Sequence, residues 1–142
     1  MKFISALLLI LACQLGLAQS LPNNKAVLIL ASAAQTAAEV DTTAQINNQW
    51  TGAQIVINVS AYTGGNYTPH VQGLDPFTGA YYDILVGSAI SATGVTVLKV
   101  GRGTLAVPNA AAQDSLPLTW RVQMIGAATP SMTFSITANL GI

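Results

Sequence analysis

Charged side chains are scarce in this chain of 142 residues, which contains five Lys and Arg, five Asp and Glu, and one His. Charged residues make up 7% of the sequence, whereas they make up about a quarter of ordinary soluble domains. Acid–base catalysis, metal binding and phosphate binding all require positioned carboxylates, imidazoles, thiolates or cations. We therefore predict a protein that is not an enzyme and that has no cofactor or metal site.

Basic clusters and cysteine pairs are also missing. The formal net charge is zero, so no basic patch is available to neutralise a phosphate backbone, and nucleic acid is not an expected partner. Cys13 is the sole cysteine, which excludes a disulfide within the chain. The apolar run Phe3–Ala12 is shorter than the roughly 20 residues that cross a bilayer. No stable membrane span is predicted.

The first 18 residues have the pattern of a secretory signal peptide. Lys2 supplies a positive start, the apolar run follows, and Gly16 and Ala18 are small residues suited to a cleavage site after Ala18. Two alternatives are a lipoprotein signal that ends at Cys13 and an apolar N-terminal arm that is retained in an assembly. We predict that residues 19–142 form a single β-sandwich domain, which is long enough to bury its own core.

The rest of the chain shows alternation with a period of two. Apolar and polar residues alternate around 55–59, over 119–124 and, most regularly, over 132–140. Such alternation is typical of antiparallel strands with one buried and one polar face. Turn-forming segments rich in Gly, Pro, Asn and Asp separate these runs. The pattern predicts an all-β protein, an antiparallel β-sandwich of the jelly-roll or immunoglobulin-like kind, with about seven or eight strands.

The segment Asp75–Gly79 predicts a hairpin connection. Pro76 presets φ for a type I turn, and Gly79 tolerates the left-handed position that follows. The hairpin would pair Thr68–Leu74 with Tyr81–Val86, and it would place Tyr81 and Tyr82 on opposite faces.

Three further segments bear on where strands begin and end. Gly64–Asn66 and Thr129–Pro130 are predicted to separate one strand from the next. The alanine-rich segment Ala31–Ala38 allows two interpretations. Alanine favours a short helix, whereas the Thr and Gln residues and the flanking strands favour a loop or an extended arm.

His70 is the only imidazole and is the obvious candidate for catalysis. A Ser-His-Asp arrangement would need Asp75 or Asp83 as its third member, but the sequence has no G-x-S-x-G nucleophile motif. Asp75 and Asp83 flank the same hairpin and are too few for the six to eight oxygens that Ca²⁺ prefers. We expect Asp75 to cap its own turn and His70 to be an ordinary strand residue.

Aromatic residues are the best candidates for a binding surface. Stacking on a sugar ring requires exposed aromatic rings with amides beside them, and the chain has both. Trp120 shares a predicted strand face with Val122 and Met124, so we assign it to the core. The candidate surface or interface residues are Trp50, Tyr62, Tyr67, Tyr81 and Tyr82.

Between Lys25 and Leu140 the chain resembles a group of small β-sandwich virion proteins that are encoded by tailed bacteriophages and prophages. The segments that carry the resemblance are Val27–Ala38, Ile55–Val59, Val71–Leu85, Ala89–Val100 and Asp114–Val122. They include the aspartate-proline turn of the hairpin and a Leu-Pro-x-x-Trp-Arg strand entry. The resemblance implies a head, decoration or tail component without active-site residues.

We therefore expect a structural protein that packs as a homo-oligomer or against capsid or tail proteins. The alternative is a secreted β-sandwich module that binds polysaccharide or a cell surface, with a glycan as its ligand. A phage virion protein assembles in the host cytoplasm and has no use for an export signal. The expected location is therefore a virion, or the extracellular space if the leader is cleaved.

Overall fold

The computed structural model describes residues 24–141, and every regular element among them is a β-strand, which confirms the all-β prediction. The predicted signal peptide lies outside the described residues. The strands are β1 (Asn24–Gln35), β2 (Glu39–Asp41), β3 (Gln45–Ile46), β4 (Gly52–Leu74), β5 (Tyr81–Val86), β6 (Gly94–Gly101), β7 (Ala111–Ala112) and β8 (Thr119–Gly141). Within this part of the chain, no helix is long and apolar enough to cross a membrane.

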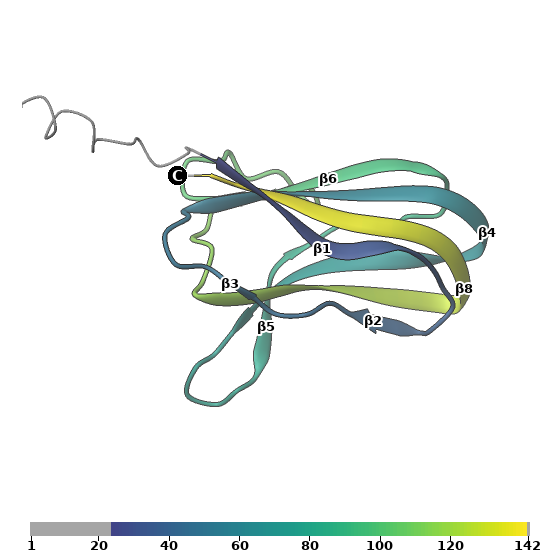
Figure 1. Cartoon of the computed structure of the whole chain (residues 1–142), viewed down its shortest axis with the longest axis horizontal. Helices are drawn as coiled ribbons and strands as arrows, with labels where there is room; N and C mark the ends of the chain where they lie inside the picture. Colours follow the sequence, from purple (N-terminus) through teal and green to yellow (C-terminus); the bar gives the residue numbers. More distant parts are fainter. Residues whose placement is uncertain (1–23, 142) are drawn as a thin grey trace, which may run out of the picture.

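Two strands, β4 and β8, are far longer than the rest, with 23 residues each. They pair antiparallel from Gly52↔Gly141 to Gly73↔Trp120, and both bend at the same end of the molecule (Figure 1). The pairing shifts register at the bend, between Gly64 and Asn66. The two predicted breaks at Gly64–Asn66 and Thr129–Pro130 are therefore bends inside continuous strands. The prediction of separate strands there is wrong because each long strand keeps its partner through the bend.

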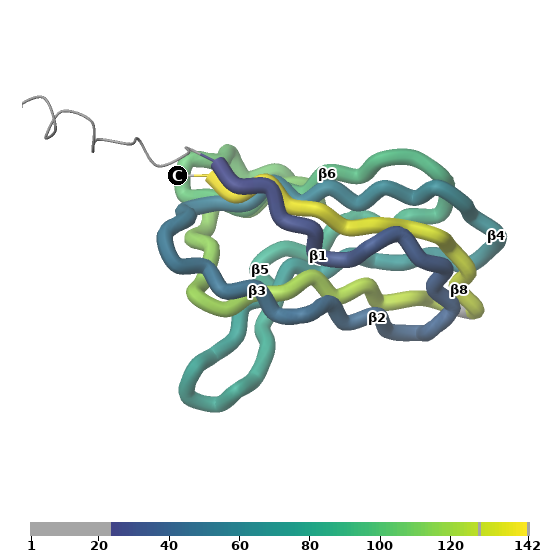
Figure 2. The backbone as a smooth tube through the Cα atoms, in the orientation of Figure 1, coloured from purple at the N-terminus to yellow at the C-terminus, as the bar shows by residue number. Residues whose placement is uncertain are grey.

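The bend folds the sheet into two layers (Figures 1 and 2). Layer one contains, in order, β1, residues 131–141 of β8, residues 52–62 of β4, and β6. Layer two contains β2 and β3 at one edge, residues 119–127 of β8, residues 66–74 of β4, and β5. A count of eight strands results when each half of β4 and of β8 is taken as one strand, β2 and β3 are taken together, and the short β7 is left out. Numbered along the chain in this way, the two layers have the strand orders 1-8-3-6 and 2-7-4-5. This arrangement is a jelly roll.

The alternating residues of the long strands fill the space between the layers. Phe134 and Ile136 of layer one and Trp120 and Val122 of layer two have no exposed surface. The rings of Tyr67 and Phe134 meet edge to face across the layers, with centroids 5.4 Å apart, a favoured geometry for aromatic pairs. Each fully buried side chain of this size contributes about 1.5–3 kcal/mol to the free energy of folding through its removal from water. The inward-facing residues of β4 and β8 in the two layers are therefore the main source of stability.

The predicted hairpin is confirmed: Leu74 pairs with Tyr81, and the turn closes through hydrogen bonds from the Asp75 amide to the Ala80 carbonyl and from the Gly79 amide to the Asp75 carbonyl, both 2.9 Å long. Figure 1 shows the hairpin projecting from the body of the sandwich.

Of the two interpretations of the alanine-rich segment, the extended one holds: β1 continues to Gln35 and pairs Ala33 with Phe134. Pairing with a neighbouring strand outweighs the helix propensity of alanine. One expectation needs correction, because the sheet is not purely antiparallel: the short strand β7 joins β6 in parallel.

Gly65 is the residue on which the bend depends, and its replacement provides a test. Its φ is +70°, and a Cβ there would lie 2.6 Å from the Cα of Pro130. We expect Gly65→Ala to lower the free energy of unfolding by about 3 kcal/mol, through left-handed strain and overpacking against the backbone, as measured by urea denaturation.

The neighbouring Gly64→Ala is the matched control, because a Cβ at Gly64 meets nothing within 4 Å. Equal stability of the two variants would contradict the role assigned to Gly65.

Candidate functional site

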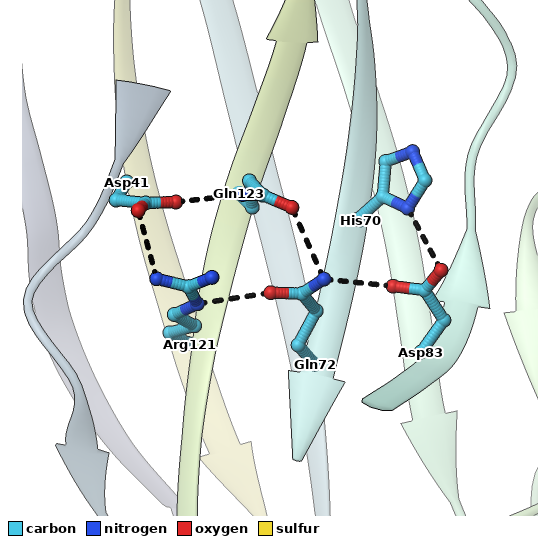
Figure 3. A network of polar contacts seen from close by, with 6 residues as sticks. All are labelled: Asp41, His70, Gln72, Asp83, Arg121 and Gln123. Atoms are coloured by element: carbon cyan, nitrogen blue, oxygen red, sulfur yellow. Dashed lines mark hydrogen bonds and ion pairs between the residues drawn. The ribbon is translucent and has the colours of Figure 1, made fainter. Parts of the chain in front are cut away.

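The outer face of layer two carries a network of polar side chains that comes from four strands of the layer, β2, β8, β4 and β5 (Figure 3). Alternation sets their direction: since Trp120, Val122 and Met124 point inward, the side chains of Arg121 and Gln123 between them point outward. The remaining members of the network are Asp41 of β2, His70 and Gln72 of β4, and Asp83 of β5.

Gln72 is the centre of this network. Its Oε1 accepts a hydrogen bond of 2.9 Å from Arg121 Nε, and its Nε2 donates to Gln123 Oε1 at 3.1 Å and to Asp83 Oδ1 at 3.0 Å. Asp41 lies at the β2 end of the network. Its carboxylate forms an ion pair with Arg121 Nη1 at 2.9 Å and accepts a hydrogen bond from Gln123 Nε2, also at 2.9 Å. The amides and ions of the face therefore satisfy one another within the chain.

Burial distinguishes this network from an ordinary set of surface charges. Gln72 and Gln123 are buried, and the Arg121 guanidinium lies 3.9 Å from the centre of the Tyr81 ring. Isolated surface ion pairs contribute little, but buried amides that lose a partner cost a good deal. The arrangement holds four strands in register rather than offering free groups to a ligand.

Within the network, His70 contacts Asp83. Its Nδ1 lies 3.1 Å from Asp83 Oδ2, and because a carboxylate only accepts, Nδ1 carries the hydrogen. The geometry is that of a His-Asp pair, but no hydroxyl or thiol side chain hydrogen-bonds to His70 within residues 24–141. In the same part of the chain there is also no group of three or more His, Cys, Asp or Glu that would hold a metal ion.

Asp75 lies at the hairpin tip, away from this pair. Its carboxylate accepts hydrogen bonds from the Phe77 amide at 3.0 Å and from the Thr78 hydroxyl at 2.6 Å. These bonds, led by that from Thr78, lower the pKa of the Asp75 carboxyl. The prediction that Asp75 caps its own turn is confirmed.

The outer face of layer one has the opposite character, because its outward residues are amides, hydroxyls and aliphatic side chains. Outward residues of β4, β8 and β6 in this layer include Gln54, Val56, Asn58, Ser135, Thr137, Asn139, Val95, Val97 and Lys99, of which Lys99 alone is charged. Val95 is 64% exposed. We call this surface, together with the outward Leu28 of β1 and apart from Lys99, the uncharged face.

The structure does not bring the five candidate aromatic residues together. Trp50 and Tyr67 are buried, so their assignment to the surface is corrected: Tyr67 packs on Phe134 in the core, and its hydroxyl donates to the Ala37 carbonyl at 2.7 Å. Tyr62 lies near the bend, with its hydroxyl bonded to the Gly65 carbonyl.

The other two tyrosines lie at the base of the hairpin. The Tyr81 ring stacks under a guanidinium, and Tyr82 packs against Gly73. Tyr62, Tyr81 and Tyr82 therefore form no shared stacking platform.

Two features of the surface were missed from the sequence. The members of the network were visible as polar positions of alternating strands, but their mutual contacts depend on register and on which strands become neighbours. Phe77 was read only as part of a turn, and it is 97% exposed. The position of Phe77 between Pro76 and Thr78, inside a predicted turn, was the sequence signal that could have indicated its exposure.

Comparison with known proteins places the fold. No family model and no curated protein matches the chain. Among solved structures, a chain of infectious bursal disease virus, Gx strain, has a TM-score of 0.51 and 9% identity, over 84% of this chain and 32% of that one. A chain of the Gt strain has a TM-score of 0.41 and 10% identity, over 84% and 34% of the two chains.

At this level of identity the likeness to the Gx-strain chain shows the fold alone, and this chain spans about a third of the viral chain's length. The virus is not a tailed phage, so the likeness extends to a viral chain and not to the phage group.

Replacing Gln72 with leucine tests whether the network holds the strands together. Gln72→Leu removes partners from Arg121, Gln123 and Asp83, so we expect a loss of about 1–3 kcal/mol in the free energy of unfolding. The matched control is Gln54→Leu on the same strand, which changes an exposed amide of the uncharged face. Equal urea midpoints for the two variants would show that the network contributes nothing to stability.

Proposed function

We propose that this chain is a non-enzymatic structural protein that assembles with copies of itself or onto a protein lattice. The observation that carries the proposal is the uncharged face of layer one. Its central row crosses four strands, because Leu28 pairs with Thr137, Thr137 with Val56, and Val56 with Val97. Three of these four residues are aliphatic, and Leu28 is 63% exposed.

Such a face is suited to burial against another protein. The free-energy cost of removing neutral amides and hydroxyls from water is smaller than that of removing charged groups. Amides and hydroxyls can also form hydrogen bonds with one another across an interface. A net charge of zero also lowers the repulsion between copies. In layer two, Asp41, Asp83 and Arg121 already have partners within the network.

The fold favours a virion as the place of assembly. Jelly rolls occur in viral capsids and in lectins. The lectin-like alternative needs a stacking platform, and the exposed tyrosines do not form one. The likeness to a chain of a virus structure and the sequence resemblance to phage virion proteins support a virion component, at the level of a head, decoration or tail protein.

Light scattering tests the assembly. We expect the full chain, followed by size-exclusion chromatography with light scattering over about a thousandfold range of concentration, to show an apparent mass that rises above the 14.6 kDa monomer. Residues 19–142 in parallel control for association through the apolar N-terminus. A monomer at every concentration for both forms would contradict the proposal.

The location is tested separately by the mature N-terminus. A cleaved signal leaves Gln19 as the first residue, and we expect intact-mass spectrometry of the protein from its producing cells to find that form. A chain that keeps Met1 within assembled particles would instead identify the leader as a retained arm. Either result leaves the assembly itself to the light-scattering test.

A further inference from the structure

The hairpin between β4 and β5 presents one hydrophobic side chain to solvent. Phe77 is 97% exposed at the tip of a hairpin that projects from the body of the sandwich (Figure 1). A phenylalanine buries roughly 150–250 Å² when it is covered, so covering the Phe77 ring would remove a large apolar surface from water.

The tip is held in one conformation before any contact forms. The Asp75 carboxylate binds the Phe77 amide and the Thr78 hydroxyl, and the Thr78 hydroxyl in turn accepts the Ala80 amide at 3.3 Å. Backbone bonds from Asp75 to Ala80 and from Gly79 to Asp75 close the turn. Little conformational entropy remains to be lost when such a tip binds. We call Asp75–Gly79 the Phe77 tip.

The same chain carries a groove at the opposite edge of layer two. It lies between the edge strands β1 and β3, has a volume of about 490 Å³, and is lined by Val27, Leu28, Ile46, Trp50 and Leu140 with Lys25 and several amides. Its rim residues Leu28 and Ile46 are 63% and 60% exposed. The lining is mixed, and its polar atoms expose slightly more surface than its apolar atoms. The apolar side chains can receive an aromatic ring while the polar groups pair with the turn residues beside it. We call it the edge groove.

We propose that the Phe77 tip of one copy of this chain inserts into the edge groove of a second copy. This inference rests on the proposed assembly function and names the contact that it uses. The charges of the two features are complementary, because the Asp75 carboxylate lies beside the phenyl ring of the tip and Lys25 lines the groove. Lys25 takes part in neither ion pair of residues 24–141.

The placement of the two features makes the contact head-to-tail. In layer two β3 pairs with β8, β8 with β4, and β4 with β5, so β3 beside the groove and β5 of the hairpin are three strand spacings apart across the sheet, roughly 14 Å. A tip and a groove at different edges generate a closed ring or an open filament, because every copy keeps one free tip and one free groove until the array closes.

Two substitutions in the full chain test the two sides of this contact one at a time. Phe77→Asp removes the tip, and Ile46→Asp places a charge on the groove rim. Each variant alone is expected to raise the concentration of half-assembly by at least about tenfold in light scattering. Leu105→Asp is the matched control, because Leu105 is 82% exposed and belongs to neither feature; it should assemble like the unmodified chain. Circular dichroism and urea midpoints verify that all three variants fold.

Mixing the two variants gives the decisive measurement. The Ile46→Asp chain keeps its tip and the Phe77→Asp chain keeps its groove, so an equimolar mixture should form a dimer of twice the 14.6 kDa chain mass and grow no further. A mixture that stays monomeric overturns the contact. So does normal assembly of either variant alone, and if only Phe77→Asp fails to assemble, the tip binds elsewhere.

These results are distinguishable from failure of the proposed function. If the unmodified chain assembles but the variants assemble equally well, the assembly function stands and the tip-in-groove contact is wrong. If the unmodified chain is a monomer at every concentration, both are wrong.

Discussion

The antiparallel pairing of β4 with β8 supports both layers of the molecule at once. In layer one β1 attaches to β8 and β6 attaches to β4, and in layer two β2 and β3 attach to β8 while β5 attaches to β4. Neither layer has a strand pair independent of this ribbon, except for the short β7 on β6. Because the same two strands pass through both layers, loss of pairing in one layer disturbs the other, and we expect the sandwich to unfold as one cooperative unit.

The bend of this ribbon also determines how the scarce charges are used. Strand alternation continues on both sides of the bend, so each half of each long strand keeps one row for the core and one row for solvent. In layer two the outward rows of neighbouring strands contain Arg121 beside Gln72 and Gln123 beside His70, which lets a few charges and amides satisfy one another. Apart from Lys99, the outward rows of layer one contain hydroxyls, amides and valines, which carry no charge that needs a partner within the chain.

The strands and the hairpin were predictable from the sequence because their signals are local. A period of two over 132–140 and a Pro-Gly turn at Asp75–Gly79 each act within a few residues. The bend was not predictable, since Gly65 looks like a strand terminator until the pairing of β4 with β8 is known. Tyr67 was misplaced for a related reason: only the packing of one layer on the other reveals that Phe134 covers it.

The contacts between polar side chains depend on still more distant information. Gln72 and Gln123 are 51 residues apart in sequence, and no spacing rule links them. Their contact follows only from the register of two long strands, which a shift of one residue would abolish. The sequence therefore showed which kinds of side chain lie on this face, but it could not show which of them contact one another.

A surface with so little charge has few electrostatic means of selecting a partner or an orientation. Selectivity must then come from shape. Strand addition at the open edge β1 is one route, but β1 is interrupted by two register shifts between Leu28 and Ala33, and such bulges twist an edge away from continued pairing. In the proposed contact, a single aromatic side chain on a rigid turn enters the edge groove. The direction of assembly then comes mainly from shape, with Asp75 and Lys25 as the one pair of complementary charges. The uncharged face can then be buried against a neighbour or a lattice without having to specify its orientation.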